Sequence, residues 1–382
     1  MRWFGFGFNA FGQIRVHDKS IKGESSDEVK VSSPSELTLA SQVDTCCQIR
    51  ASWSRAAALH LDGDSCVCLA GFTESCGVPL KESQGCKDAI ISESYLTLAF
   101  SDRLESWDLH KKEKTPSWSM EIKTHSESSG PPSVHLPLVP EGYIATKPPL
   151  YRPLSPHLRA KSLALSAEHA VLLSASGTVY TWGLGSHGQL GHGDLTSEEE
   201  PRAVEALWGM PMSCVATGGW HSVCVSDGGD LYVWGWNESG QLGLPSRGLR
   251  KAAEQQQQSS QQAGAPCQDT STSPAEEPQQ GEEHEEVFIS IQAFPALLDI
   301  TPSCEVRTVS CGSRHTAAVT TTGDLYTWGW GDYGQLGQQN LMSSDEPQLV
   351  EFFREQKMRV VDAACGMWNT FAAVLQEEVA CS

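Results

Sequence analysis

Basic residues are scarce in this sequence of 382 residues. Lysine and arginine number 27 against 47 aspartates and glutamates, so the formal net charge at pH 7 is −20. Binding to duplex DNA depends on clustered lysine and arginine side chains that neutralise phosphates. The composition therefore argues against direct binding to duplex DNA, and it favours partners with basic protein surfaces.

Long apolar runs and paired metal-binding cysteines are also missing. No stretch of 18 apolar residues occurs, so we expect no membrane-spanning helix, and residues 1–5 (MRWFG) do not begin a signal peptide. The 13 cysteines include no pair of C-x-x-C motifs, which argues against a zinc ribbon. These features are typical of a reducing, nucleocytoplasmic compartment.

Catalytic and cofactor motifs lack their usual context. There is no G-x-S-x-G nucleophile elbow and no activated-cysteine signature. Residues 183–188 (GLGSHG) match the dinucleotide fingerprint G-x-G-x-x-G, but the spacing recurs at 329–334 and no helical pattern follows either copy. We interpret these glycines as turn residues and expect no enzyme activity and no cofactor.

A repeat dominates the second half of the chain. Residues 309–337 (VSCGSRHTAAVTTTGDLYTWGWGDYGQLG), 215–243 (VATGGWHSVCVSDGGDLYVWGWNESGQLG) and 165–191 share one pattern. Each copy predicts antiparallel strands joined by a turn that contains glycine, the residue that tight hairpins need for positive φ. One small sheet cannot bury both of its faces, whereas similar sheets stacked around an axis can. The repeat therefore predicts an all-β fold, a β-propeller.

The two ends of the chain contain complementary halves of this repeat. Residues 360–371 carry its first half and stop, while residues 6–14 (FGFNAFGQI) match residues 234–242 (WGWNESGQL). We predict that the N-terminal strands complete the last blade, which removes free sheet edges. Residues 1–382 then form a single, monomeric ring.

Weaker copies and insertions account for the rest. Degenerate units at 48–71 and 88–109 bring the countable blades to six, and residues 111–160 leave room for a seventh, so the residues alone do not settle the number. Residues 17–42 are predicted to be a loop and residues 125–160 a Pro-rich strap. Residues 245–287, which are rich in glutamine and carry eight acids against three bases, have the composition of a disordered insert.

The repeat resembles that of the regulator of chromosome condensation family, whose consensus runs G-x-x-H-[TS], D-G and V-Y-x-W-G-x-N-x-x-G-Q-L-G. Three nearly complete copies and two half copies match it. The resemblance implies seven blades and a role in chromatin and mitosis, in the nucleus and on chromosomes, with the cytoplasm as a second compartment. The founding member is a guanine-nucleotide exchange factor for a small GTPase, which is the alternative function.

The stretch YRPL at 151–154 and the corner GGWHS at 218–222 resemble one member of the family in particular. That resemblance implies a non-enzymatic scaffold whose partner is a JmjC-domain 2-oxoglutarate oxygenase, a histone lysine demethylase, with histones as further partners. It also implies roles in histone methylation, chromosome segregation and microtubule stability.

Candidate contact residues are large side chains that depart from the repeat at exposed corners. For each of them a structural role is as open as a role in binding a partner. They are Trp220, Arg314, Trp368 and Asn369, together with Tyr151 and Arg152 in the strap. We expect Trp234, Trp236, Trp328 and Trp330 to pack within the sheets rather than form an interaction surface. For His169, His221 and His315, which share one repeat position, we favour hydrogen bonds within each blade over a metal site.

Overall fold

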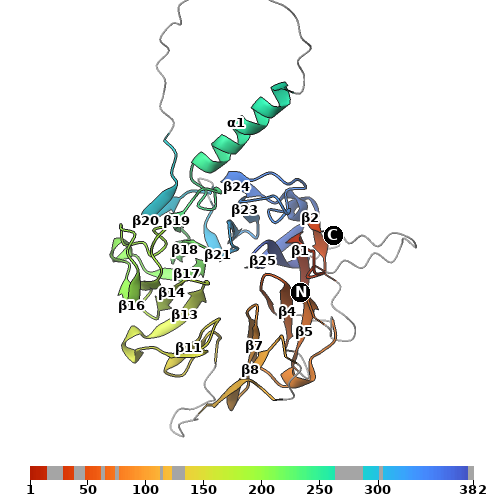
Figure 1. Ribbon diagram of the computed structural model, residues 1–382, viewed down its shortest axis with the longest axis vertical. Helices are drawn as coiled ribbons and strands as arrows, with labels where there is room; N and C mark the ends of the chain where they lie inside the picture. The colour runs from red at the N-terminus through yellow and green to blue at the C-terminus, as the bar shows by residue number, and fades with distance from the viewer. Residues whose placement is uncertain are drawn as a thin grey trace, which may run out of the picture.

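Antiparallel strands make up most of the regular structure in the computed structural model of the chain (Figure 1). The structure describes residues 1–14, 29–37, 48–61, 65–73, 77–111, 115–122, 134–262, 287–300 and 304–376. Within these ranges the strands form seven sheets, which are the blades of a ring around one axis. The predicted all-β propeller is confirmed, and the number of blades is seven.

Three consecutive blades carry the complete repeat, and in each the strand order within the sheet follows the sequence. Their second strands are wholly buried because they face both neighbouring blades, which explains their continuous apolar runs. The strands are β13 (Ala160–Leu165), β14 (His169–Ser174), β15 (Val179–Gly183), β16 (Glu198–Ala203), β17 (Met212–Thr217), β18 (His221–Ser226), β19 (Leu231–Trp236), β20 (Ile291–Leu298), β21 (Val306–Cys311), β22 (His315–Thr320), β23 (Leu325–Gly329) and β24 (Ser344–Leu349).

The ring closes where the two ends of the chain meet. Strand β1 (Arg2–Phe8) pairs with β26 (Asn369–Gln376), with Phe4 opposite Ala372, and β25 (Met358–Cys365) pairs with the other edge of β26. Side chains of β1 enter the core between blades, and Phe6 is fully buried. The predicted closure is therefore confirmed, and Figure 1 shows β1 and β25 in the same blade, near the N-terminus.

The outer strand of this closing blade corrects the loop that the sequence predicted at residues 17–42. Residues 30–36 form β2 (Lys30–Glu36), which pairs with β1. Only Val31 and Pro34 of this strand are buried. An outermost strand covers one neighbour and accepts polar residues and proline, so its pattern does not look like a strand. Residues 15–28 and 38–47 lie outside the described residues.

The first half of the ring contains the degenerate blades. Their strands are β3 (Gln48–Ala51), β4 (Arg55–His60), β5 (Cys66–Gly71), β6 (Asp88–Ile91), β7 (Tyr95–Ala99), β8 (Arg103–Asp108), β9 (Trp118–Glu121), β10 (Leu138–Val139), β11 (Gly142–Ile144) and β12 (Tyr151–Pro153). The last three form the seventh blade inside the predicted strap at 125–160, which corrects that prediction. These strands hold two or three residues each and are flanked by prolines, so no periodicity could reveal them.

The helices among the described residues are few and lie in the connections between strands. They are η1 (Lys81–Ser83), η2 (Pro156–Leu158), η3 (Glu205–Leu207), α1 (Arg247–Gln262) and α2 (Glu351–Glu355). Helix α1 occupies the first part of the insert predicted to be disordered at 245–287, and it projects from the ring in Figure 1. Alanine, glutamine, arginine and lysine are good helix formers, and Ser246 caps the helix by accepting a hydrogen bond from the amide of Leu249. Residues 263–286 lie outside the described residues.

Histidines at the start of second strands hold neighbouring blades together. The Nε2 atom of each lies 2.8 or 2.9 Å from a hydroxyl of the following blade, in the pairs His169–Ser222, His221–Thr316 and His315–Thr370. The prediction of hydrogen bonds within each blade was therefore wrong for these atoms, although Nδ1 of His169 also contacts Ser166 in its own blade. We call these contacts the blade staples.

Each staple continues into the G-Q-L segment of the repeat. The hydroxyls of Ser222, Thr316 and Thr370 donate, each at 2.8 Å, to the backbone carbonyls of Gln189, Gln241 and Gln335. These carbonyls belong to the blade that supplies the histidine, so each staple closes a network across the interface. Burial lowers the pKa of all three histidines to about 3, and they are neutral at pH 7.

Candidate functional site

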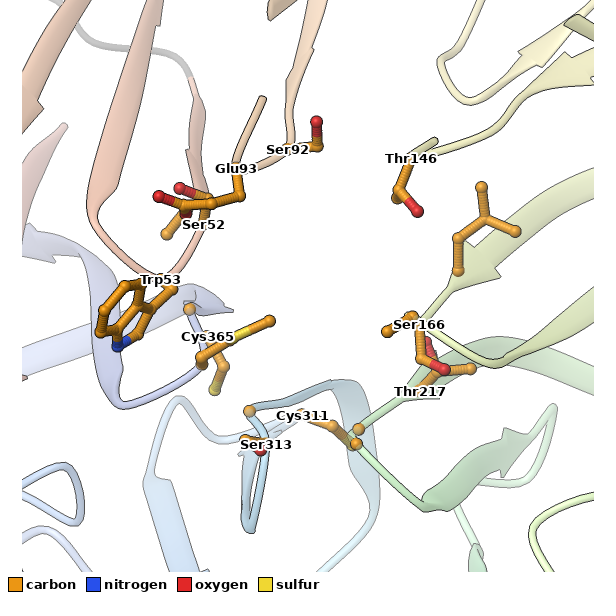
Figure 2. Close-up of a pocket in the computed structure, with 18 of the residues that line it drawn as sticks. Ser52, Trp53, Ser92, Glu93, Thr146, Ser166, Thr217, Cys311, Ser313 and Cys365 are labelled. Atoms are coloured by element: carbon orange, nitrogen blue, oxygen red, sulfur yellow. The ribbon is translucent and has the colours of Figure 1, made fainter. Parts of the chain in front are cut away.

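The loops that precede the second strands of six blades, together with the β11–β12 loop of the seventh, surround the axis on one face of the ring. They enclose a cavity of about 380 Å³, the axial pocket, to which every blade contributes. The lining loops contain residues 51–53, 91–94, 146–147, 165–168, 217–220, 311–313 and 365–367. Figure 2 shows their side chains around an open centre, with Trp53 on one side and Thr146, Ser166 and Thr217 on the other. A cavity of this size is near the lower end of ligand sites.

The wall of the axial pocket carries hydroxyls and thiols. Hydroxyls come from Ser52, Ser92, Thr146, Ser166, Thr217 and Ser313. Burial raises the pKa of the Cys365 thiol to about 12 and that of Cys311 well above its ordinary value. Both cysteines therefore stay protonated at pH 7 and are poor nucleophiles.

Two carboxylates lie at the edge of the pocket, and both are engaged. Glu93 pairs with the buried Arg55 at 3.2 Å and also accepts a hydrogen bond from the hydroxyl of Ser54. Glu168 accepts a hydrogen bond from Nε1 of Trp220 at 2.6 Å. These contacts fix the loops of adjacent blades relative to one another.

Aromatic rings extend from this pocket across the same face. We define the aromatic arc as the following residues: His187, Trp220, Trp236, Arg314, Trp330, Tyr333, Trp368, Phe8, Phe11, Trp53 and Phe72. Centroids of rings in contact along the arc are 4.8 to 6.1 Å apart, mostly edge to face. The guanidinium of Arg314 joins its two halves, 5.0 Å from the centroid of Trp236 and 5.8 Å from that of Trp330. Aromatic pairs and cation–π contacts hold these side chains in fixed positions.

The structure brings three of the six predicted contact residues together in this arc. Trp220, Arg314 and Trp368 are half-buried in adjacent corners. Asn369 lies apart from them in the interior at 1% exposure, where its Nδ2 donates to the backbone carbonyl of Phe8. It offers no surface for a partner.

Tyr151 and Arg152 lie on β12, away from the arc. The hydroxyl of Tyr151 donates to the carbonyl of Glu141 at 3.1 Å. Arg152 is exposed and lines a second cavity of about 190 Å³, which shares Lys147 and Glu168 with the axial pocket. Arg152 therefore stands beside the axial pocket, and both residues belong to a blade rather than to a free strap.

The second tryptophan of each W-G-W motif lies on this surface, although the repeat pattern predicted that it packs within the sheet. Trp234 and Trp328 are fully buried, as predicted, but Trp236 and Trp330 are half-exposed members of the arc. The register of β19 against β20 shifts beside Gly235, whose φ is 110°. Such a bulge redirects the next side chain, so Trp236 leaves the side of the strand on which Trp234 lies. In the sequence, the glycine between the two tryptophans was the signal that could have indicated this bulge.

Other candidate chemistry is not supported by the described residues. Residues 183–188 form the end of β15 and a turn, and β16 rather than a helix follows. Within the described ranges, histidine, cysteine and carboxylate side chains form no group that could hold a metal ion. None of the helices described is long and apolar enough to cross a membrane.

Comparisons with known proteins agree with this architecture. The family model described as "Regulator of chromosome condensation (RCC1) repeat" matches residues 176–225, 228–268 and 322–373, and a second model of the same repeat matches 160–189, 213–241 and 306–335. Human RCC1 domain-containing protein 1 is 42% identical over 98% of this chain and 97% of its own length, and the mouse protein is 40% identical over the same shares. The crystal structure of Prp20p from Saccharomyces cerevisiae, at 14% identity, covers 99% of this chain and 92% of its own with a TM-score of 0.68.

Proposed function

Because this chain belongs to the RCC1 repeat family, we propose that it is a non-enzymatic scaffold that binds partner proteins through the aromatic arc. The arc is the observation that carries the proposal. Tryptophan, tyrosine and arginine dominate the binding energy of protein interfaces, where they act as rigid anchors. Here they converge from five adjacent blades, with Trp53 42% and Phe72 59% exposed.

The partner we propose is a JmjC-domain 2-oxoglutarate oxygenase that acts on histone lysine methylation. This choice rests on the likeness to RCC1 domain-containing protein 1, and it includes a place in the nucleus and on chromosomes and roles in chromosome segregation and microtubule stability. Histones are the second proposed partner, since the net charge of −20 favours association with basic proteins. Prp20p, which shares this fold, was crystallised and studied for its binding properties to Gsp1p and histones.

Guanine-nucleotide exchange on a small GTPase is the competing function. It is the activity of the founding member of the repeat family, and this chain shares the Prp20p fold over 99% of its length. Nucleotide-release assays with labelled GDP separate the two hypotheses. Faster GDP release from a small GTPase at catalytic amounts of this protein would show exchange-factor activity and would contradict the purely scaffolding function.

The scaffold proposal is tested with surface variants in affinity purification from nuclear and cytoplasmic extracts. Trp220→Ala combined with Trp368→Ala removes two anchors of the arc, and Leu61→Ala combined with Val78→Ala, at residues 43% and 59% exposed outside it, is the matched control. We expect the double variant to lose the oxygenase and histones and the control to retain them, with equal thermal stability. Retention of both partners by a folded double variant would exclude the arc as the binding surface.

A further inference from the structure

A second surface with exposed apolar side chains lies on the outer rim, remote from the axial pocket. Phe294 and Leu297 of β20 are 54% and 52% exposed, Ile291 is 38% exposed, and Trp208 is 63% exposed. We call these four residues the rim patch. Figure 1 shows β20 at the outer edge of the ring, beside the blade that contains β16. Large apolar side chains gathered at one exposed place mark an interaction site.

Two connections of the preceding blade hold the rim patch together. The loop after β15 reaches across to β20, where the amide of Gly193 donates to the carbonyl of Ala293 at 3.0 Å and Gly193 lies against the ring of Phe294. At the other end, η3 packs against β20, and Trp208 follows η3 directly. The patch is therefore built on strands and anchored turns.

The edge of β20 is closed to an added strand. The carbonyl of Ala293 already accepts the Gly193 amide, and Pro295, two residues further on, has no amide to donate. A partner cannot extend this sheet along its length. It must contact the apolar side chains themselves.

The charge around the patch decides what kind of partner fits. Residues 193–208 contain five carboxylates and a single basic residue, Arg202, and residues 294–299 add the carboxylate of Asp299. Arg202 is already paired with Glu198 at 2.6 Å. Glu199 and Glu200 are exposed on β16. Phosphate-bearing ligands, anionic membranes and a second copy of this acidic surface would all be repelled.

We propose that the rim patch binds a basic amphipathic helix of a partner protein. Phe294 and Leu297 are about 10 Å apart along an extended strand, which is also about the rise of two helical turns. A helix with apolar residues at i, i+3, i+4 and i+7 would place them over this patch and direct its lysines and arginines toward Glu199 and Glu200. Its inner end adjoins the aromatic arc, since Ile291 pairs with Trp236, and the helix would lie farther out on the rim.

The test uses the full chain and a designed, fluorescein-labelled 18-residue helix with leucines on one face and lysines on the other. Fluorescence anisotropy gives its dissociation constant. Leu297→Ser and Glu199→Lys should each weaken binding about tenfold, the effect of losing one important contact. Glu346→Lys changes the net charge equally on the outer strand β24 of the next blade, and it should leave affinity within about twofold.

Each outcome decides the proposal. Equal weakening by Glu346→Lys and Glu199→Lys would mean general attraction to an acidic protein, and would overturn the assignment. So would absence of binding, or equal binding of a peptide with glutamates in place of the lysines. A dimer in sedimentation that Leu297→Ser dissociates would assign the patch to a second copy instead. If Leu297→Ser fails to fold, the exposed Glu199 and Glu346 variants settle the question alone.

Discussion

The three staple histidines predict that the ring loses stability in mild acid. Their pKa falls from the ordinary 6.5 to about 3 on folding, because burial disfavours the charged imidazole. As the pH drops below 6.5, the unfolded chain binds these protons while the folded chain does not. The free energy of unfolding is therefore unaffected by these histidines above pH 6.5, and it decreases as the pH falls from 6.5 toward 3. Each histidine should cost about 2 kcal/mol between pH 7 and pH 5, and the three together about 6 kcal/mol.

Replacement of one histidine isolates this effect from other titrating groups. In His221→Asn the loss between pH 7 and pH 5 should shrink to about 4 kcal/mol, because two staples remain to titrate. Asparagine already occupies this place in the closing blade, as Asn369, so the backbone accepts it. The variant should also lose about 1 kcal/mol at pH 7 with the bond to Thr316.

Urea unfolding at pH 7, 6 and 5, followed by circular dichroism, measures these free energies. His157→Asn, at an exposed histidine outside the staples, is the matched control and should keep the wild-type pH dependence. The reasoning fails if His221→Asn has the wild-type slope, since the imidazole would then not be a neutral, buried group. It also fails if the wild-type midpoint does not move between pH 7 and pH 5.

Three further changes test the closure and the packing of the blades. Deletion of residues 1–14 removes β1 and should unfold the ring in circular dichroism, and a folded, protease-resistant monomer would contradict this. Arg55→Met breaks the buried contact with Glu93 and should cost about 2 kcal/mol in urea unfolding, more than the milder Glu93→Gln. Gly7→Ala introduces a Cβ at a φ of 111° and 2.5 Å from the carbonyl oxygen of Trp368, so its melting temperature should fall by several degrees, about 2 kcal/mol of stability. An unchanged melting temperature would mean that the backbone relaxes there.

The sequence was informative where the repeat is regular. Residues 165–191, 215–243 and 309–337 predicted complete blades, because a buried second strand and glycine turns recur at fixed distances. The match between residues 6–14 and 234–242 predicted the closure, since each half needs the other to complete a sheet. The hydrogen bonds of the staple histidines could not be predicted in the same way. They cross between blades, and no spacing within one copy of the repeat shows this.

The remaining elements were hidden because their patterns are weak. Strands β10 to β12 are too short to alternate, and β2 is an outermost strand of mostly polar residues. Helix α1 has a mean composition typical of disorder, but its alanines and glutamines favour a helix once Ser246 caps it. The rim patch depends on a loop and a turn of the preceding blade meeting β20, and only the folded ring shows that arrangement.

One position in the repeat explains why the predicted contact residues separate into two groups. The first residue of the strand after each pocket-lining loop is His169, His221, His315, Asn369, Arg55, Tyr95 or Tyr151. In three blades this residue forms a staple, and in a fourth Arg55 reaches the next blade by donating to the carbonyl of Glu93 at 2.9 Å. Asn369 occupies the same position and donates to the carbonyl of Phe8 in the interior. Tyr151, at the start of β12, instead donates to the carbonyl of Glu141 at the surface.

The residue immediately before this position has the opposite environment. It is Trp220, Arg314 and Trp368 in three consecutive blades, all on the face that carries the aromatic arc. Because the following residue is fixed inside the ring, the side chain before it is held at the surface in a defined direction. The interior position therefore gives the arc its rigidity, and it costs a partner little entropy to bind side chains that are already immobile.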